Sequence, residues 1–346
     1  MSVPSRVQQC RFVALVFLLT GFASAAFAQE RADCHPFRST VLHSSVGYCV
    51  FLPASYSSSD AKSRRYPVLY MLHGLGGNQQ TMVLSGEWSL LQDLRKEQKV
   101  GDFLVVAPDG LDTFYINSED GKTLYGDFFL REFMPFIEKT YRVRAERETR
   151  GITGFSMGGY GAIRIAFGHP ELFGSVSAHS AVLLRAPPQG TDAGAASGNL
   201  PAEILTKVFG DPIDRKFWDL NSPFVLAKND AAQLRKMKIY FDCGNQDSFG
   251  LNRGASELNQ GTNGRNSLSQ SGRPGANGAR IPSRSLLAAA CRGSAPQCLM
   301  ARTISPGGPG GFCGEAASHD ERGLNRENES NRARTSGNPR ANVPAK

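Results

Sequence analysis

The stretch "ITGFSMGGYGA", Ile152 to Ala162, holds a serine between glycines in the pattern Gly-x-Ser-x-Gly. A short apolar run precedes the serine and a small, apolar, helix-length segment follows it, so the stretch predicts a strand, a sharp turn and a helix. Such a turn presents the serine hydroxyl at the N-terminus of the helix, where the helix dipole favours negative charge. Ser156 is therefore the candidate nucleophile, and the alternative is a turn of small residues without chemistry.

Apolar runs on both sides of this stretch predict the rest of a sheet. One run, Val46–Pro53, alternates as a half-exposed strand does, and five continuous runs are typical of buried parallel strands: Pro67–Gly74, Phe103–Gly110, Thr149–Phe155, Phe173–Ser180 and Met237–Gly244. Helix-length segments lie between them, at Trp88–Lys99, Phe128–Thr140 (kinked at Pro135), Tyr160–Gly168 and Leu200–Phe209. The alternation predicts an α/β fold with a mainly parallel, doubly wound sheet and a site at the carboxyl ends of its strands.

The chain divides into three parts by composition. Residues 1–28 have the features of a signal peptide: Arg6 and Arg11, an apolar run, and an Ala-x-Ala signal ending at Ala28. Residues 33–260 carry the strands and helices. Residues 261–346 are rich in Gly, Arg, Ser, Asn and Pro without an apolar period, so we expect this C-terminal tail to be disordered and the α/β fold to be incomplete there.

The signal peptide predicts a secreted or periplasmic protein with no membrane span after cleavage, and an uncleaved anchor is the alternative. Export permits disulfides, and Cys34 and Cys49 are placed to pair across the first strand. The net charge is +8, of which the tail carries most, with eleven Arg and one Lys against five acidic residues. Because Phe312 is the tail's only aromatic residue, a nucleic-acid-binding role is not favoured.

If Ser156 attacks a carbonyl carbon, the acyl transfer needs hydrogen-bond donors for the developing oxyanion. One predicted donor is the backbone N–H of Met157, directly after the nucleophile. The second is expected from the glycine-rich loop "HGLGGN", where we favour Leu75, with Gly76 as the alternative. We expect His73 to support this loop rather than to act as a base.

An acid is available past the nucleophile, in "IYFDCGNQDSF". We expect Asp242, at the strand end, to bond backbone amides and Asp247, on the following loop, to orient an imidazole. The polar residues Tyr115, Asn117 and His179 are candidates for the wall of the substrate pocket.

Four motifs, "HGLGGN", "GFSMGGYGAIRIAFGHPELFGSVSAHS", "FWDLNSP" and "IYFDCGNQD", resemble the esterase D family in the same order. That family includes S-formylglutathione hydrolases, enterochelin- and feruloyl-esterase-like enzymes and mycolyltransferases. The resemblance, over Phe37 to Gln260, implies an α/β-hydrolase fold and a hydrolase of carboxylic esters or thioesters, or an acyltransferase. It also implies Ser156 as nucleophile, Asp247 as acid, and Leu75 and Met157 as oxyanion donors. A small-molecule ester or thioester is the expected partner, and neither metal nor organic cofactor is expected.

The histidine of such a triad is missing from its usual place. In the family it follows the acid by some thirty residues, but the corresponding region near Ala279–Pro282 holds no histidine. Only His319 follows Asp247, within the tail, so it is the remaining candidate base. Two explanations for the tail stay open: a shift of reading frame near Gly261, or a divergent extension. Two functions stay open as well, an exported serine hydrolase and a catalytically impaired remnant that at most binds a ligand.

Overall fold

The computed structural model describes residues 29–188, 202–244 and 250–261. All of them belong to one compact unit, Met1–Thr303. The predicted signal peptide, the C-terminal tail, Asp247 and His319 lie outside the described residues, so the predictions for them stay predictions.

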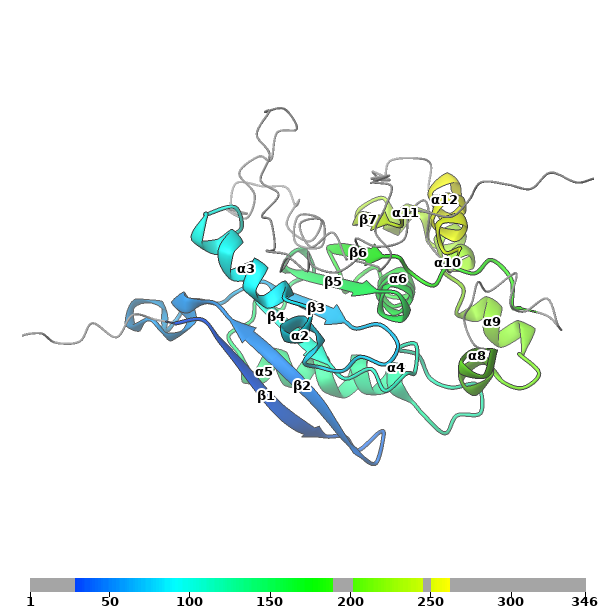
Figure 1. Cartoon of the computed structure of the whole chain (residues 1–346), viewed down its shortest axis with the longest axis horizontal. Helices are drawn as coiled ribbons and strands as arrows, with labels where there is room; N and C mark the ends of the chain where they lie inside the picture. Colours follow the sequence, from blue (N-terminus) through cyan, green and yellow to red (C-terminus); the bar gives the residue numbers. More distant parts are fainter. Residues whose placement is uncertain (1–28, 189–201, 245–249, 262–346) are drawn as a thin grey trace, which may run out of the picture. The chain divides into compact units, whose positions relative to one another are not determined.

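A seven-stranded sheet runs through the described residues in the order β1-β2-β4-β3-β5-β6-β7 (Figure 1). Its strands are β1 (Arg31–Arg38), β2 (Ser45–Leu52), β3 (Val68–Leu72), β4 (Leu104–Pro108), β5 (Arg150–Phe155), β6 (Ser175–His179) and β7 (Lys238–Asp242). The pairs β1–β2 and β2–β4 are antiparallel, whereas β3, β4, β5, β6 and β7 pair in parallel. The predicted α/β class and the mainly parallel sheet are therefore confirmed.

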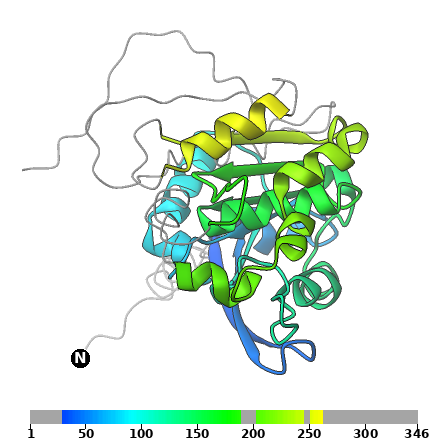
Figure 2. The ribbon, with the colours of Figure 1, turned by 90° about the vertical axis from the view of Figure 1, so that its right-hand side faces the viewer.

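Helices connect the strands and cover the sheet (Figures 1 and 2). The α-helices are α2 (Thr81–Leu84), α3 (Glu87–Lys96), α4 (Tyr125–Asp127), α5 (Met134–Thr140), α6 (Met157–Gly168), α8 (Ala202–Phe209), α9 (Arg215–Leu220), α10 (Pro223–Asn229), α11 (Ala231–Leu234) and α12 (Asn252–Gly261). Short 3-10 turns are η1 (Ala54–Ser57), η2 (Ser59–Ala61) and η4 (Arg147–Thr149), and η3 (Phe128–Phe133) is π-helical. None of these helices is long and apolar enough to cross a bilayer.

Two apolar cores lie on opposite faces of the sheet because neighbouring strand residues point to opposite sides. The larger core joins strand residues such as Tyr70 and Ile152 to α6, which is buried along almost its whole length. The smaller core joins Phe51 and Leu69 to Leu91 of α3. Helix α6 therefore sits against the sheet directly behind the serine turn, which fixes the position of that turn.

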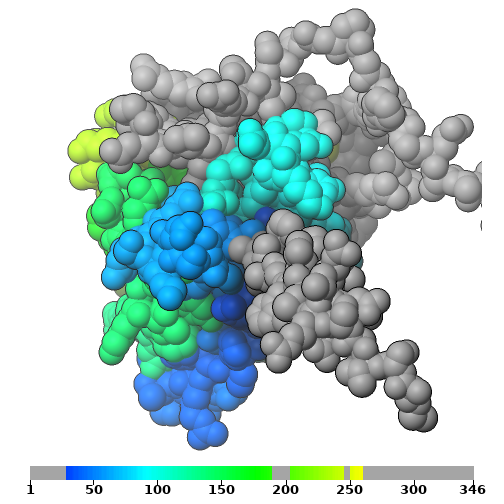
Figure 3. Space-filling model, turned by 90° about the vertical axis from the view of Figure 1, so that its left-hand side faces the viewer, coloured from blue at the N-terminus to red at the C-terminus, as the bar shows by residue number. Residues whose placement is uncertain are grey.

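The six predicted strands are all present, but the sequence reasoning missed β1. Its side chains are mostly exposed and it contains Pro36, so it shows neither alternation nor an apolar run. Pairing with β2 along its whole length holds it at the sheet edge, where proline is tolerated. The predicted Cys34–Cys49 disulfide is confirmed and joins the two strands. The blue hairpin lies at the surface in the space-filling view (Figure 3).

The predicted helices are also present, with shifted ends. The segment predicted as Phe128–Thr140 starts as the π-helical η3 and continues as α5, and Pro135 occupies the first turn of α5. Pro135 has no N–H to donate, and the N–H of Met134 before it bonds the Phe129 carbonyl five residues back, so the π-helical turn leads directly into the proline. The sequence reasoning missed the short helices α2, α9, α10 and α11, whose length gives too little periodicity to detect. It also missed the ten-residue α12, whose sequence is mostly polar residues and glycine.

Candidate active site

Ser156 stands between the end of β5 and the first residue of α6, in the geometry predicted from its glycine pattern. Its backbone has φ 54° and ψ −115°, a conformation that costs a non-glycine residue about 1–3 kcal/mol. Three main-chain bonds hold it: its N–H donates to the carbonyl of His179 at 2.9 Å, and its own carbonyl accepts from the N–H groups of Tyr160 at 3.0 Å and Val182 at 3.2 Å. The side chain is half-buried, so the turn presents the hydroxyl without sealing it in the core.

The glycines around the serine are required by close approach of the chain. A Cβ on Gly158 would lie 2.0 Å from the carbonyl oxygen of Leu72, and one on Gly154 would lie 2.2 Å from that of Gly158. Both contacts are with backbone, which cannot rotate away as a side chain can. The turn can therefore form only with glycine at these positions, which is the physical reason for the pattern Gly-x-Ser-x-Gly.

The loop His73–Asn78, called here the oxyanion loop, follows β3 and lies beside the serine. A Cβ built on Gly74 would be 3.4 Å from Cβ of Ser156. The Gly77 N–H donates to the carbonyl of Gly74 at 3.0 Å, and Gly76 between them has φ +72°. A hydrogen-bonded four-residue turn with a left-handed third residue is a type II turn, for which glycine is favoured at that position.

The backbone amides of this loop differ in availability. The Gly76 N–H donates to Oδ1 of Asp112 at 3.0 Å, so it is already occupied. Among the described residues, no acceptor bonds the Leu75 N–H. Met157 is the first residue of α6, where an N–H has no partner within the helix. Within the described residues, the N–H groups of Leu75 and Met157 thus have no bonded acceptor outside a possible ligand, whereas that of Gly76 has one.

His73 is buried, and both of its ring nitrogens are used within the loops. Nδ1 lies 2.8 Å from the carbonyl oxygen of Gly74, and Nε2 lies 2.6 Å from the N–H of Gly110. Since a carbonyl only accepts and an N–H only donates, this bonding assigns the tautomer protonated at Nδ1. The ring therefore joins two loops and has no lone pair left for a serine proton, in agreement with the supporting role expected for it.

His179, predicted to line the pocket, is buried at the end of β6 with 1% of its surface exposed. Its Nδ1 lies 3.0 and 3.1 Å from the two carboxylate oxygens of Asp242, which also accepts from the Tyr240 hydroxyl at 3.0 Å. Within the described residues, Nε2 of His179 has no hydrogen-bond partner. Asp242 therefore binds an imidazole and a phenol through its carboxylate, contacts that the sequence reasoning did not foresee, and the expected bonds to backbone amides stay a prediction.

Two further predicted wall residues have structural contacts instead. Tyr115 is fully buried and donates from its hydroxyl to the carbonyl of His73 at 3.0 Å. Burial, and next the nearby Tyr125 and Asp109, raise the pKa of Tyr115 well above its ordinary value, so it stays a neutral donor. Asn117 accepts the N–H of Asp127 at 3.1 Å through Oδ1. The loop thus directs the Tyr115 hydroxyl and Oδ1 of the half-buried Asn117 to backbone groups, and their place in the pocket wall stays a prediction.

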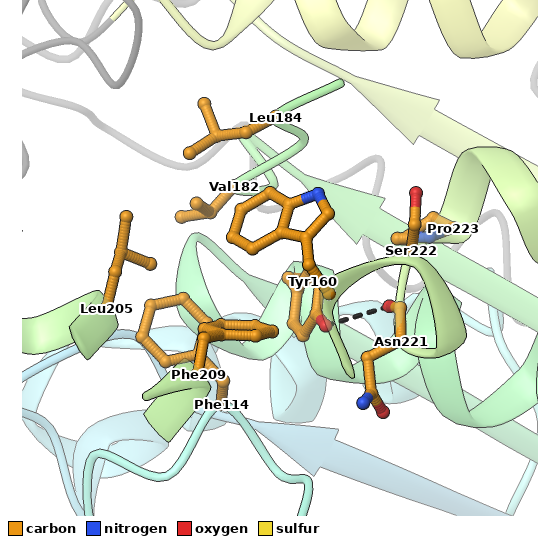
Figure 4. A pocket seen from close by; sticks show the side chains of 10 residues that line it. Phe114, Tyr160, Val182, Leu184, Leu205, Phe209, Asn221, Ser222 and Pro223 are labelled. Carbon is orange, nitrogen blue, oxygen red and sulfur yellow. Dashed lines mark hydrogen bonds between the residues drawn. The ribbon is translucent and has the colours of Figure 1, made fainter. Parts of the chain in front are cut away.

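A mostly apolar hollow of about 270 Å³, part of it open to solvent, lies on the α6 side of the sheet (Figure 4). Its lining includes Phe114, Tyr160, Val182, Leu205, Phe209 and Trp218. The Tyr160 hydroxyl donates to the Asn221 carbonyl at 2.8 Å, shown as a dashed line in Figure 4. Val182 also donates its N–H to the Ser156 carbonyl, so the hollow lies next to the backbone of the serine turn. No sequence signal marked it, since its residues come from five separate segments.

Residues 29–188, 202–244 and 250–261 contain no group of three His, Cys, Asp or Glu side chains that could hold a metal ion. The chemistry that the described residues offer is a strained serine hydroxyl with two free amides beside it.

Comparison with known proteins assigns the family. Residues 39–279 match the family described as "Putative esterase". The chain belongs to this esterase family. Among curated proteins it is 32% identical over 148 residues to Esterase Rv1288 of Mycobacterium tuberculosis, a match that covers 42% of this chain and 31% of that protein. It is 27% identical over 197 residues to an acetyl esterase of Caldicellulosiruptor saccharolyticus, covering 56% of this chain and 71% of the relative.

Solved structures agree with this assignment. A ferulic acid esterase superposes with a TM-score of 0.57 at 26% identity. The superposition covers 69% of the present chain and 89% of the ferulic acid esterase. The serine hydrolase FphF of Staphylococcus aureus superposes with a TM-score of 0.61 at 19% identity, and the superposition covers 75% of the present chain and 98% of FphF. The α/β-hydrolase fold is therefore established. The match with the mycobacterial esterase spans less than a third of that protein's length.

Proposed function

We propose that this chain is an exported serine esterase that hydrolyses small carboxylic esters through an acyl-serine intermediate. The observation that carries the proposal is the strained Ser156 turn with the free N–H groups of Leu75 and Met157 beside it. Membership of the esterase family supports ester cleavage, and the relatives named above include an acetyl esterase and a ferulic acid esterase. Thioesters and transfer to an acceptor alcohol use the same acyl-serine and are alternatives within this proposal.

In the proposed reaction, Oγ of Ser156 adds to the ester carbonyl carbon, and the carbonyl π electrons move onto oxygen. The resulting oxyanion accepts hydrogen bonds from Leu75 and Met157, each of which is expected to contribute about 10²–10³ in rate. Collapse of the tetrahedral intermediate breaks the bond to the alcohol, which leaves with a proton. Water then adds to the acyl-serine in the same way, releasing the acid and restoring the hydroxyl.

The proton of Ser156 needs an acceptor, and here one observation favours a second function. Among the described residues, the Ser156 hydroxyl forms no hydrogen bond to a histidine. The predicted acid Asp247 and the predicted base His319 lie outside the described residues. If no histidine reaches the serine, turnover falls by about 10⁶ relative to an intact triad. The oxyanion donors and substrate binding then still give a rate enhancement of about 10³–10⁴ over the reaction in water. The chain would then be an impaired member of its family.

One experiment separates the two functions. Wild type and Ser156→Ala are assayed with p-nitrophenyl acetate and with a p-nitrophenyl ester of an aromatic acid, and both are exposed to a fluorophosphonate reagent. An initial burst, steady turnover and a mass increase on the Ser156 peptide, all absent from the variant, are expected for the esterase. Equal hydrolysis by both proteins, with no labelled peptide, would refute the acyl-serine mechanism and favour the impaired member.

Export is proposed on the signal-like N-terminus and is supported by the Cys34–Cys49 disulfide. Disulfides of this kind form and persist in oxidising compartments such as the periplasm. Expression in a bacterium, followed by fractionation and N-terminal sequencing, should yield a chain that begins at Gln29 in the periplasm or medium. A full-length chain in the cytoplasm would contradict export without bearing on the esterase chemistry.

A further inference from the structure

The loop after β4, residues 109–116, is bonded to the oxyanion loop at several points and is called here the strap loop. The Gly110 N–H donates to Nε2 of His73 at 2.6 Å, and the Tyr115 hydroxyl donates to the His73 carbonyl at 3.0 Å. Oδ1 of Asp112 accepts the Gly76 N–H at 3.0 Å. The strap loop therefore holds both the beginning of the oxyanion loop and its central turn.

The strap loop adopts an unfavourable backbone to make these contacts. Four of its non-glycine residues have left-handed φ angles: Leu111 at 50°, Asp112 at 55°, Phe114 at 54° and Tyr115 at 59°. Each such residue costs about 1–2 kcal/mol, and strain of this kind persists at functional sites when the surroundings over-determine it. In the strap loop, the left-handed backbone places the carboxylate of Asp112 at the Gly76 amide and the hydroxyl of Tyr115 at the His73 carbonyl.

The Asp112 contact falls on the one peptide of the oxyanion loop that distinguishes its turn type. Types I and II turns differ by a flip of the peptide between the second and third residues, here Leu75 and Gly76. An acceptor at the Gly76 N–H fixes that flip and with it the conformation of the loop next to Ser156. The same contact removes Gly76 from the set of free donors, because its amide cannot serve a carboxylate and an oxyanion together.

We propose that Asp112 is a positioning residue that locks the oxyanion loop in the flipped turn and leaves Leu75 as its oxyanion donor. This inference rests on the proposed function, since it concerns the same reaction at Ser156. The proposal needs the acceptor oxygen of Asp112, not its charge. Asparagine keeps that oxygen, so Asp112→Asn should retain what Asp112→Ala loses.

The first measurement follows hydrogen exchange of the peptide that contains Gly76, in the full-length chain. Exchange of this amide should be at least about tenfold faster in Asp112→Ala and close to wild type in Asp112→Asn, because only the alanine variant removes its acceptor. Asp93→Ala, which removes an exposed carboxylate from α3, is the matched control and should leave exchange unchanged. Unchanged exchange in Asp112→Ala would overturn the proposal.

The second measurement follows the rate at which a fluorophosphonate reagent phosphonylates Ser156. A misplaced catalytic group costs up to about 10²-fold, so Asp112→Ala should lower the maximal labelling rate about 10- to 100-fold with little change in the half-saturating reagent concentration. Asp112→Asn should restore most of that rate. A structural role alone would not separate the maximal labelling rates of the alanine and asparagine variants in this way. A wild-type labelling rate in Asp112→Ala, or equal losses of rate in both variants, would overturn the proposal. If wild type is not labelled at all, the proposed function fails, while the exchange experiment still decides whether Asp112 holds the turn.

Discussion

Glu87 is a buried carboxylate whose ionisation should weaken the fold near neutral pH. It is the first residue of α3, only 6% of its surface is exposed, and the side chain of Ser85 is the polar group that acts on its carboxylate. Burial raises the pKa of Glu87 from 4.5 to about 7, and the hydrogen bond with the Ser85 side chain offsets this rise only in part. A neutral amide at this position should therefore be tolerated better than the carboxylate once the pH exceeds that pKa.

The magnitude follows from linkage. A pKa raised from 4.5 to about 7 means that the folded protein holds a proton which the unfolded chain has lost, so the free energy of unfolding decreases as the pH rises through this range. At 1.36 kcal/mol per pH unit, the full penalty above the folded pKa is about 3 kcal/mol. Because glutamine is also a buried polar group, we expect Glu87→Gln to recover about 1–3 kcal/mol at about pH 8 and close to none at about pH 4.5.

Urea unfolding of wild type and variant at these two pH values provides the measurement. Glu97→Gln, on an exposed residue just past the same helix, is the control and should change stability by less than about 0.5 kcal/mol at either pH. A gain for Glu87→Gln that is equal at both pH values would refute the linkage argument, since only an ionising carboxylate gives a pH-dependent difference. A loss at the higher pH would show that the carboxylate has a stabilising partner when ionised.

Three other substitutions test the elbow, the hairpin and the buried pair. Gly158→Ala should abolish labelling of the serine and destabilise the fold by more than about 3 kcal/mol, because its Cβ would meet the Leu72 carbonyl oxygen at 2.0 Å; unaltered labelling and melting would contradict this. Cys34→Ser, which leaves Cys49 unpaired, should lower the free energy of unfolding by about 3 kcal/mol, as expected for a closed loop of this length, and reduced wild type should match it. Asp242→Asn removes the charge that accepts from a buried imidazole and should cost about 1–3 kcal/mol, measured by urea unfolding at about pH 8; no change there would mean that the pair adds nothing.

Sequence by itself determined the features that depend on local pattern. Continuous apolar runs identified the buried parallel strands, since a strand covered on both faces needs apolar side chains at every position. The glycines around Ser156 identified the turn, since only residues without Cβ allow β3, β5 and α6 to approach so closely. The spacing of Cys34 and Cys49, 15 residues apart in a chain predicted to be exported, was sufficient to suggest that they could pair, although the strand that carries Cys34 was missed.

Tertiary structure alone decided which polar side chains form hydrogen bonds with which partners. Tyr115 and Asp112 look like exposed polar residues in the sequence, but a left-handed backbone turns one inward and places the other on the Gly76 amide. His179 and Asp242 are distant in sequence and meet only because β6 and β7 pair in register. Such contacts depend on directions set by φ angles and strand register, which composition and periodicity do not encode.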